Sequence, residues 1–343
     1  MRNRPGHLLL GMLAAVMLAG CEDRSLPPEL ASQPADQSLF TRDEYGEIAV
    51  VGASASDPLW PVIQASARRF APNIEAQVRF HAPAAASPQA QIDLIRSLLT
   101  PNLRGLCVQV SEPAALSGVL QDAINRGVPV VSIGHPAPAT VRVGHVGFDD
   151  DEIGRLLASA VAKALDDDGT IMVLHAGSEH PAYGLRLAGF RREIRLHPRI
   201  DVFAELDCRG SSLEARRLIR ERMERYPRLD AWVWLDDWPL QDEADLSTLL
   251  GPTCKVVMFG GYPSHWPLLR SGRSPVVVTA DFSELGAKAV QFCDTALREP
   301  SRFESRYHAP LRTVWSIMLD AFVADWNRWV APPEPATAGA RAR

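Results

Sequence analysis

Short runs of apolar and β-branched residues alternate along this chain with longer segments in which apolar residues recur at helical spacing. The first unit begins with Ile48-Ala49-Val50-Val51, which has the length and composition of a buried parallel strand. A loop of small residues follows, and then Asp57 and Pro58, a preferred pair for the start of a helix. This stretch predicts one strand–loop–helix unit, with its helix over 58–70.

The alternation continues over most of the remaining chain. Further strands are predicted at 75–81, 103–110, 128–133, 141–146, 170–175, 200–206, 231–235, 255–259 and 275–280, and further helices begin near residues 87, 111, 149, 182, 211, 239, 263 and 283. Because 343 residues exceed what one hydrophobic core usually organises, the two βαβα runs predict an α/β fold of two doubly wound, parallel-sheet lobes. The helix that begins near residue 239 is expected to end at 250.

The C-terminal part follows a different pattern. An extended stretch is predicted at 302–313, followed by an amphipathic helix at 314–330. This helix carries Trp315, Phe322, Trp326 and Trp329. Residues 331–343 are expected to form a disordered tail.

The N-terminus has the pattern of an export signal. Arg2 and Arg4 precede an apolar stretch that is too short to span a bilayer comfortably. The stretch ends in Leu18-Ala19-Gly20-Cys21, which resembles the bacterial lipobox. We therefore expect a lipoprotein signal peptide at 1–20, a lipid on Cys21, and a flexible, Pro- and Ser-rich tether at 21–45. The alternative is an ordinary secretory signal with a chance cysteine; in either case the protein is exported, to the periplasm or the cell surface.

Composition narrows the class of partner. Hydrophobic residues make up 46% and charged residues 22% of the chain, as in ordinary soluble proteins. The net charge of −5 argues against nucleic acid as a partner. Besides Cys21, the chain has Cys107, Cys208, Cys254 and Cys293, which we interpret as mostly buried thiols because no spacing among them is typical of a zinc site. No metal and no cofactor is expected, and nothing in the sequence indicates an oligomer.

Several phrases, in their order, resemble the type I periplasmic binding proteins of the ribose/galactose kind, whose ligand-binding fold is shared with lac-repressor-like regulators. The resemblance covers about residues 46–312. The phrases are Ile48-Ala49-Val50-Val51 with Asp57-Pro58-Leu59-Trp60, Ala123–Val131, Val146–Asp150 with Ile153-Gly154, Gly189-Phe190, Val257–Gly261 and Leu285–Ala289. A DNA-binding role is disfavoured because a signal peptide takes the place of the helix-turn-helix that such a role needs.

The resemblance implies two lobes, a ligand cleft between them and a hinge that the chain crosses three times. The crossings are expected near Val146, Asp281 and Arg302. One lobe would then comprise 46–146 plus 281–302, and the other 147–280 plus 303–330.

Candidate ligand-binding residues follow the predicted strands, where ligands bind in open α/β sheets. Asp57 and Trp60 match positions that bind a sugar hydroxyl and stack on a sugar ring in that family, although a helix N-cap and a core tryptophan are their plain structural roles. The further candidates from both lobes are His135, Glu179, Tyr183, Asp236 and Asp281.

Several expected binding groups are missing. A charged clamp expected after 128–133 is replaced by Gly134-His135, and a family arginine falls at Gly184, although Arg186 lies nearby. A family aspartate corresponds to Gly260. The predicted fold survives these departures, whereas the assignment of an ordinary pentose or hexose as the ligand does not.

No motif of a nucleophile elbow, a zinc protease, a P-loop or a dinucleotide fold is present, so we expect no enzyme. The sequence predicts a lipid-anchored solute-binding protein that captures a small polar ligand, a sugar or sugar derivative, for an ABC-type importer. The alternative is a sensing or interaction lipoprotein of the same fold that partners a membrane receptor kinase.

Overall fold

The computed structural model describes residues 46–177, 180–243, 249–299 and 306–332. The chain divides at Thr41, and every described residue belongs to the unit Arg42–Arg343. The signal peptide predicted at 1–20, Cys21 and the tether predicted at 21–45 lie outside the described residues, as do Glu179 and residues 333–343.

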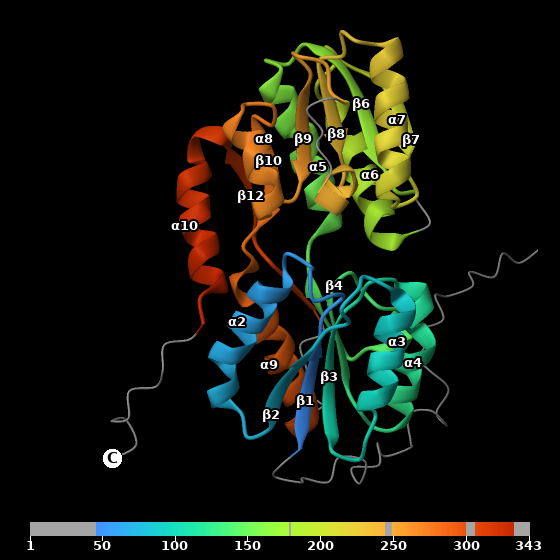
Figure 1. Ribbon diagram of the computed structural model, residues 1–343, viewed down its shortest axis with the longest axis vertical. Coiled ribbons are helices and arrows are strands. Elements are labelled where there is room, and N and C mark those ends of the chain that lie inside the picture. Colours follow the sequence, from blue (N-terminus) through green and yellow to red (C-terminus); the bar gives the residue numbers. More distant parts are fainter. Residues whose placement is uncertain (1–45, 178–179, 244–248, 300–305, 333–343) are drawn as a thin grey trace, which may run out of the picture. The chain divides into compact units, whose positions relative to one another are not determined.

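The first lobe is built on a six-stranded parallel sheet with the order β11-β5-β4-β3-β1-β2 (Figure 1). Its strands are β1 (Glu47–Val51), β2 (Gln77–His81), β3 (Leu103–Gln109), β4 (Val130–Gly134), β5 (Gly144–Gly147) and β11 (Arg306–His308). Its helices are α2 (Trp60–Phe70), α3 (Pro88–Leu98), α4 (Pro113–Asn125) and α9 (Leu285–Arg298).

Alternation along β1 explains how both faces of this sheet are covered. Ile48 and Val50 are buried in a core with residues of α2 and α9, while Ala49 and Val51 are buried in a separate core with residues of α3 and α4. Successive side chains of a strand point to opposite faces, so a continuous apolar run supplies both cores. The run Ile48–Val51 is accordingly almost fully buried.

The second lobe contains a six-stranded sheet with the order β12-β10-β9-β8-β6-β7. Its strands are β6 (Gly169–His175), β7 (Ile200–Asp207), β8 (Ala231–Trp234), β9 (Lys255–Phe259), β10 (Val276–Ala280) and β12 (Leu311–Trp315). Its helices are α5 (Asp150–Ala164), α6 (Pro181–Ile194), α7 (Ser212–Arg225), α8 (Trp266–Arg270) and α10 (Leu319–Val330). The predicted fold class is confirmed, with the addition that β12 pairs antiparallel to β10.

The chain passes between the lobes after β5, after β10 and after β11. The backbone of Ala309 donates to Gly147 at 2.9 Å, and that of Asp281 donates to Pro310 at 2.8 Å, so the three crossings are hydrogen-bonded to one another. The third crossing differs from the expectation near Arg302. Because β11 pairs with β5, residues 306–308 belong to the sheet of the first lobe, and the chain leaves that sheet at Ala309.

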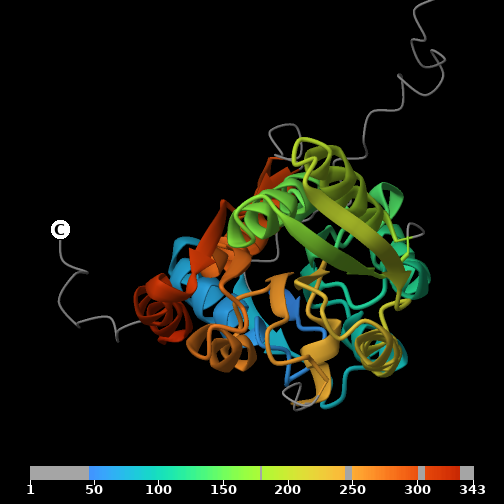
Figure 2. The same cartoon turned by 90° about the horizontal axis from the view of Figure 1, so that it is seen from above.

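The C-terminal segment also differs from its predicted form. The helix predicted at 314–330 begins at Leu319, because Val314 and Trp315 end strand β12 and a short 3-10 turn (Ser316–Met318) follows. Helix α10 packs against α2 and α8 (Figures 1 and 2). Its buried side chains include Phe322, Trp326 and Trp329. The C-terminal helix therefore touches elements of both lobes.

A second correction concerns the helix predicted at 239–250. A 3-10 helix covers Trp238–Glu243, and residues 244–248 lie outside the described ranges. This 3-10 helix packs against α7. Across the described residues, no helix has the length and apolar character needed to cross a bilayer.

The cysteine prediction is confirmed for the four described cysteines. Cys107, Cys208, Cys254 and Cys293 are free and buried. Cys208 follows the end of β7 and Cys254 precedes the start of β9, so their strands hold them at opposite edges of a sheet.

Candidate functional site

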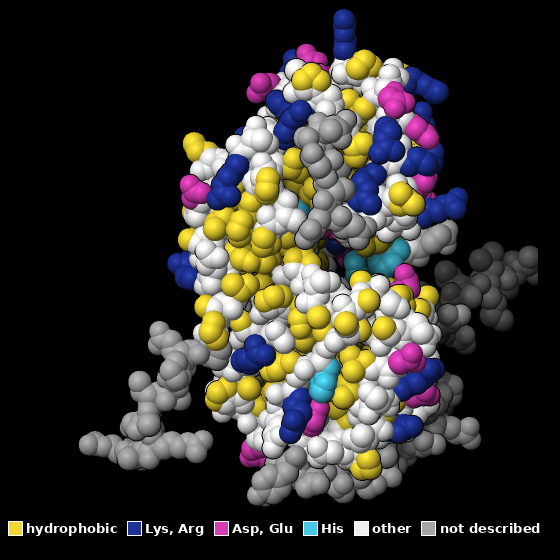
Figure 3. Space-filling view, viewed as in Figure 1, with side chains coloured by type: hydrophobic (Ala, Val, Ile, Leu, Met, Phe, Trp, Pro, Cys, Tyr) yellow, Lys and Arg dark blue, Asp and Glu magenta, His cyan; other side chains and the backbone are white. Residues whose placement is uncertain are grey.

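Polar side chains from both lobes gather beyond the carboxyl ends of the strands. Those from the first lobe follow β1, β3 and β4, and those from the second follow β8 and β9 or lie on α6. The space-filling view shows a hollow between the lobes, with histidine side chains at one rim (Figure 3). This is the region where open α/β sheets bind ligands.

Arg186 is the central charge of this region. Its Nε donates to Asp150 at 2.7 Å, and one terminal nitrogen donates to Asp236 at 2.9 Å and to the carbonyl of Leu235 at 3.0 Å. Only 2% of its side chain is exposed. Although burial opposes the charge, Asp150 and Asp236 together hold the pKa of Arg186 above its ordinary value, so the guanidinium stays charged.

Two glycines allow Arg186 to reach Asp150. A Cβ on Gly154 of α5 would lie 1.9 Å from the carbonyl oxygen of Arg186, and a Cβ on Gly189 of α6 would lie 2.1 Å from the carbonyl oxygen of Asp151. The backbones of α5 and α6 therefore approach more closely than any larger residue permits. The sequence Gly189-Phe190 contributes to the site through this packing, with Phe190 fully buried.

Asp236 and Asp237 follow β8 and have different partners. Burial raises the pKa of Asp236 to about 6, which outweighs the lowering by Arg186, and Asp237 adds to the increase. Asp237 accepts from Gln241 at 3.0 Å and contacts Nε2 of His265 at 3.2 Å. Because Nδ1 of His265 accepts from the backbone of Gly261 at 3.0 Å, the ring proton is on Nε2 and is donated to Asp237.

Asp57 lies in the loop between β1 and α2 of the first lobe. One of its oxygens accepts from the backbone of Leu59 at 2.8 Å. Gln109, the last residue of β3, accepts from the backbone of Ala53 in the same loop at 3.1 Å. Burial raises the pKa of Asp57, and the charge of Asp237 adds to this effect. Asp57 thus stabilises the turn that leads into α2, and the charge of Asp237 in the second lobe opposes the ionisation of its carboxyl.

His135 and Tyr183 connect the two lobes. The Tyr183 hydroxyl lies 3.3 Å from Nε2 of His135, and the Tyr183 ring packs edge-on against that of Trp238, with 5.0 Å between the ring centroids. The His135 ring also lies 5.0 Å from that of His180. Burial, with the nearby charge of Arg186, lowers the pKa of His135 to about 3, so the imidazole is neutral near pH 7.

Trp60 and Asp281 differ from the other candidates because their contacts serve mainly to stabilise the fold. Trp60 is 6% exposed, its ring lies 6.4 Å from that of Phe80, and a Cβ on Gly52 would clash with it. Asp281 accepts from the backbone of Ser283 at 3.0 Å and begins the turn that leads into α9. These contacts favour a core role for Trp60 and a hinge role for Asp281.

Sequence reasoning did not select Arg186, Asp150, Gln109, Tyr262 or His265 as site residues. Arg186 had a signal, since it stands two residues beyond the position where the resemblance places an arginine. His265 had none. Its ring occupies space next to Gly260, where a Cβ would lie 2.4 Å from Nδ1, so the missing family aspartate is replaced by a histidine from a following turn.

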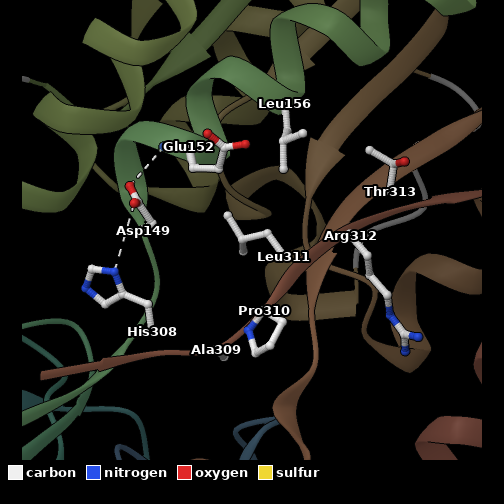
Figure 4. Close-up of a pocket in the computed structure, with 9 residues that line it drawn as sticks. All are labelled: Asp149, Glu152, Leu156, His308, Ala309, Pro310, Leu311, Arg312 and Thr313. Atoms are coloured by element: carbon white, nitrogen blue, oxygen red, sulfur yellow. Dashed lines mark hydrogen bonds and ion pairs between the residues drawn. The ribbon is translucent and has the colours of Figure 1, made fainter.

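A second hollow lies at the hinge, away from these residues. It has a volume of about 640 Å³ and is formed by the start of α5 and the segment from His308 to Thr313 (Figure 4). Asp149 and His308 face each other there, 4.0 Å apart. None of the candidate residues lines this hollow. Within the described residues, no cluster of histidine, cysteine, aspartate or glutamate has a geometry that would hold a metal ion.

A family model described as a periplasmic binding protein domain matches residues 48–300. No curated protein sequence matches the chain.

Solved structures with the same fold include three sugar- or polyol-related binding proteins. An ABC-transporter solute-binding protein from Burkholderia graminis in complex with D-arabinose is 16% identical, with a TM-score of 0.69 over 81% of this chain and 98% of that one. An arabinose-binding protein from Geobacillus stearothermophilus is 18% identical, with a TM-score of 0.71 over 81% and 99%. A solute-binding protein from Bacillus halodurans with bound myo-inositol is 19% identical, with a TM-score of 0.68 over 83% and 100%. At these identities the likeness shows the fold.

Proposed function

Since the chain belongs to the periplasmic binding protein family, we propose that it captures a small polar ligand, a sugar or sugar derivative, between its two lobes for an ABC-type importer. The observation that carries the proposal is the convergence of polar side chains from both lobes, in which His135 of the first is hydrogen-bonded to Tyr183 of the second. A ligand held between the lobes would contact Asp57 on one side and Asp236 on the other. Binding would then favour closure of the hinge.

The proposal includes a lipid anchor. The lipobox-like sequence that ends in Cys21 supports an exported protein tethered to a membrane through a diacylglycerol on this thiol. Replacing Cys21 by Ser should release the protein from the membrane fraction of the producing cell and abolish incorporation of labelled palmitate. Retention of the label in C21S would refute the anchor and leave the binding function untouched.

The binding function is tested by thermal unfolding of the unit Arg42–Arg343, which forms a compact unit of its own. A panel of aldoses, amino sugars, polyols and nucleosides at millimolar concentration should contain a compound that raises the melting temperature in a saturable manner. A ligand at 100 times its Kd stabilises by about 2.7 kcal/mol. Absence of any shift across the panel would contradict the proposed function.

A second function, sensing or interaction through a membrane receptor, is favoured by helix α10. This helix contacts α2 of the first lobe and α8 of the second, and Arg69 of α2 donates to the carbonyl of Trp329 at 3.3 Å. A surface that spans both lobes would report the state of the hinge to a partner. Charged substitutions at the exposed positions Ala321 and Ala324 should abolish recruitment of such a partner while ligand affinity is unchanged.

A further inference from the structure

Strand β12 is an outer strand of the second lobe's sheet, and among the described residues no strand pairs with its free side. The backbone of Asp281 donates to Pro310 at 2.8 Å, so Pro310 faces β10. Because hydrogen bonding alternates along an antiparallel pair, every second residue from Pro310 also faces β10. The backbone groups of Leu311, Thr313 and Trp315 therefore point away from the sheet and can pair with another strand.

Two other outer strands carry exposed charges that discourage such pairing. β2 contains Arg79, whose side chain is 59% exposed, and β7 contains Asp201 and Asp207, which are exposed. Charged side chains on an outer strand are a common protection against pairing with other chains. The one charged residue of β12 gives no such protection, because the Arg312 guanidinium lies against the Phe322 ring of α10, 5.1 Å from its centre.

Helix α5 runs beside the free side of β12 and leaves the hollow of about 640 Å³ there. Leu311 and Thr313 point to the α5 side of the strand, whereas Arg312 points to the opposite side (Figure 4). Leu156 of α5 also lines this hollow, and both leucines are half-buried. A partner strand on this edge would cover these apolar side chains, and their removal from water would favour association.

Opposite charges lie at the two ends of this side of α5. Glu152, Leu156 and Lys163 share one face, because positions four and eleven residues apart differ by about 40° or less around an α-helix. Glu152 lines the hollow and contacts Arg155 on its own helix, in a pair that solvent screens. Lys163 is exposed, and its Nζ lies 5.1 Å from the centre of the Trp315 ring. About 16 Å of helix separates Glu152 from Lys163, so these two charges cannot pair within one copy.

We propose that two copies of the protein form a two-fold dimer through the free edges of their β12 strands. In antiparallel pairing centred on Thr313, Leu311 of each copy lies opposite the partner's Trp315, and the two second-lobe sheets become one. The same symmetry brings Glu152 of each copy near the partner's Lys163. A second copy is the occupant that fits, because this edge has a negative and a positive end and therefore complements itself. The dimer is a property beyond the proposed binding function and does not depend on the ligand.

The first test is sedimentation velocity of the unit Arg42–Arg343 over a concentration series from low micromolar to near-millimolar. The unit should change from monomer to dimer across the series. Thr313→Pro should weaken the dimer about 10-fold or more, because proline removes the hydrogen bonds that the two Thr313 N–H groups donate at the two-fold axis. Proline is tolerated on an outer strand where the N–H faces solvent. Thr313→Val keeps the N–H and should dimerise like wild type.

Exchange of the charges tests how the two copies are arranged. Glu152→Lys and Lys163→Glu should each weaken the dimer about 10-fold, because each substitution places like charges together twice in a two-fold dimer. The double variant E152K/K163E should restore the wild-type dissociation constant, which a pair within one copy could not do. Arg195→Glu, an equal change of charge at the exposed C-terminal end of α6, is the control and should leave the dimer unchanged.

The outcomes decide between a second copy and other partners of this edge. A monomer at every concentration would show the inference to be wrong and would mean that something other than a second copy covers the edge. A dimer unaffected by Thr313→Pro would place the contact on another surface, and failure of the double variant to recover would contradict the antiparallel arrangement. If Thr313→Pro lowers the melting temperature of the dilute monomer, the charge exchange alone decides.

Discussion

The hydroxyl of Tyr183 in the second lobe lies 3.3 Å from Nε2 of His135 in the first. The hydroxyl can donate its proton to Nε2 when the other ring nitrogen of His135 carries the ring proton. This contact joins the end of β4 to the start of α6 without any covalent crossing. It links the lobes independently of the three hinge crossings.

Tyr183→Phe should weaken the closed arrangement of the lobes. The substitution removes one partly buried hydrogen bond, worth about 0.5–1.5 kcal/mol, and leaves the ring packing against His180 and Trp238. Small-angle scattering should show a larger radius of gyration for the ligand-free variant. Tyr226→Phe, which changes a tyrosine that packs on Phe203 within the second lobe, should not change the radius. Equal scattering curves for Y183F and wild type would contradict the proposed link.

The stability of the protein should depend on His135 at acidic pH. Burial lowers the pKa of this histidine from 6.5 to about 3, so its neutral form is favoured in the folded state. The unfolded chain takes up the proton below pH 6.5, and the stability associated with the neutral ring is therefore present above 6.5 and lost as the pH falls toward 3. The expected slope is about 1.4 kcal/mol per pH unit over this range.

Comparison of wild type with His135→Asn isolates this effect. Asp236 has the opposite effect on stability, because its raised pKa of about 6 makes its ionisation destabilising as the pH rises. Both proteins contain Asp236, so this effect cancels in the comparison. Denaturant unfolding at pH 7 and pH 5 should show that H135N loses less stability than wild type, by up to about 2 kcal/mol. Parallel pH dependence in the two proteins would show that His135 is solvated in the folded state.

Arg186→Met should be strongly destabilising. It leaves the carboxylates of Asp150 and Asp236 buried without their cation, and breaking such a buried pair typically costs about 3–5 kcal/mol. Arg192→Met on the same helix is the matched control, because its side chain is 52% exposed in its pair with Asp151 and solvent screens an exposed pair, so its loss should cost little. Similar midpoints of urea unfolding for the two variants would mean that Arg186 is not the centre of the network.

Gly260→Ala tests the replacement of a side chain by the His265 ring. The added Cβ would lie 2.2 Å from Cε1 of His265, whose ring is fully buried and hydrogen-bonded to Gly261 and Asp237. The expected loss of stability is about 1–3 kcal/mol. Gly118→Ala in α4, where a Cβ meets nothing within 4 Å, should be neutral or stabilising by up to about 1 kcal/mol. A neutral effect of G260A would place His265 elsewhere.

The strands of both lobes were predictable because each is a short apolar run between turn residues, and two adjacent cores bury such runs on both faces. The structure of the C-terminal end of the chain was not predictable in this way. Val314 and Trp315 satisfy the spacing of an amphipathic helix and equally that of an edge strand, and pairing with β10 decides between them. Residues 306–308 could not be assigned to a lobe because a three-residue strand has no periodicity to read.

The site was predictable where a residue stands in the segment that follows a strand. Asp57 follows β1, His135 follows β4, Asp236 follows β8, and Tyr183 lies near the start of α6, where it contacts His135. Arg186 reaches that region from the second turn of α6, and its path depends on the glycine contacts between α5 and α6. Tyr262 and His265 arrive through the turn at Gly260 and Gly261, whose backbone geometry cannot be derived from the order of residues.

The most direct test of the account measures the affinity of the tightest compound of the sugar panel for three variants of the unit Arg42–Arg343. Asp57→Asn in the first lobe and Asp236→Asn in the second should each weaken binding about 10-fold or more, because both carboxylates contact the ligand in the proposed complex. Glu152→Gln, in the hollow at the hinge, should leave the affinity unchanged. Full affinity in both cleft variants, or loss of binding only in E152Q, would contradict a ligand site between the lobes.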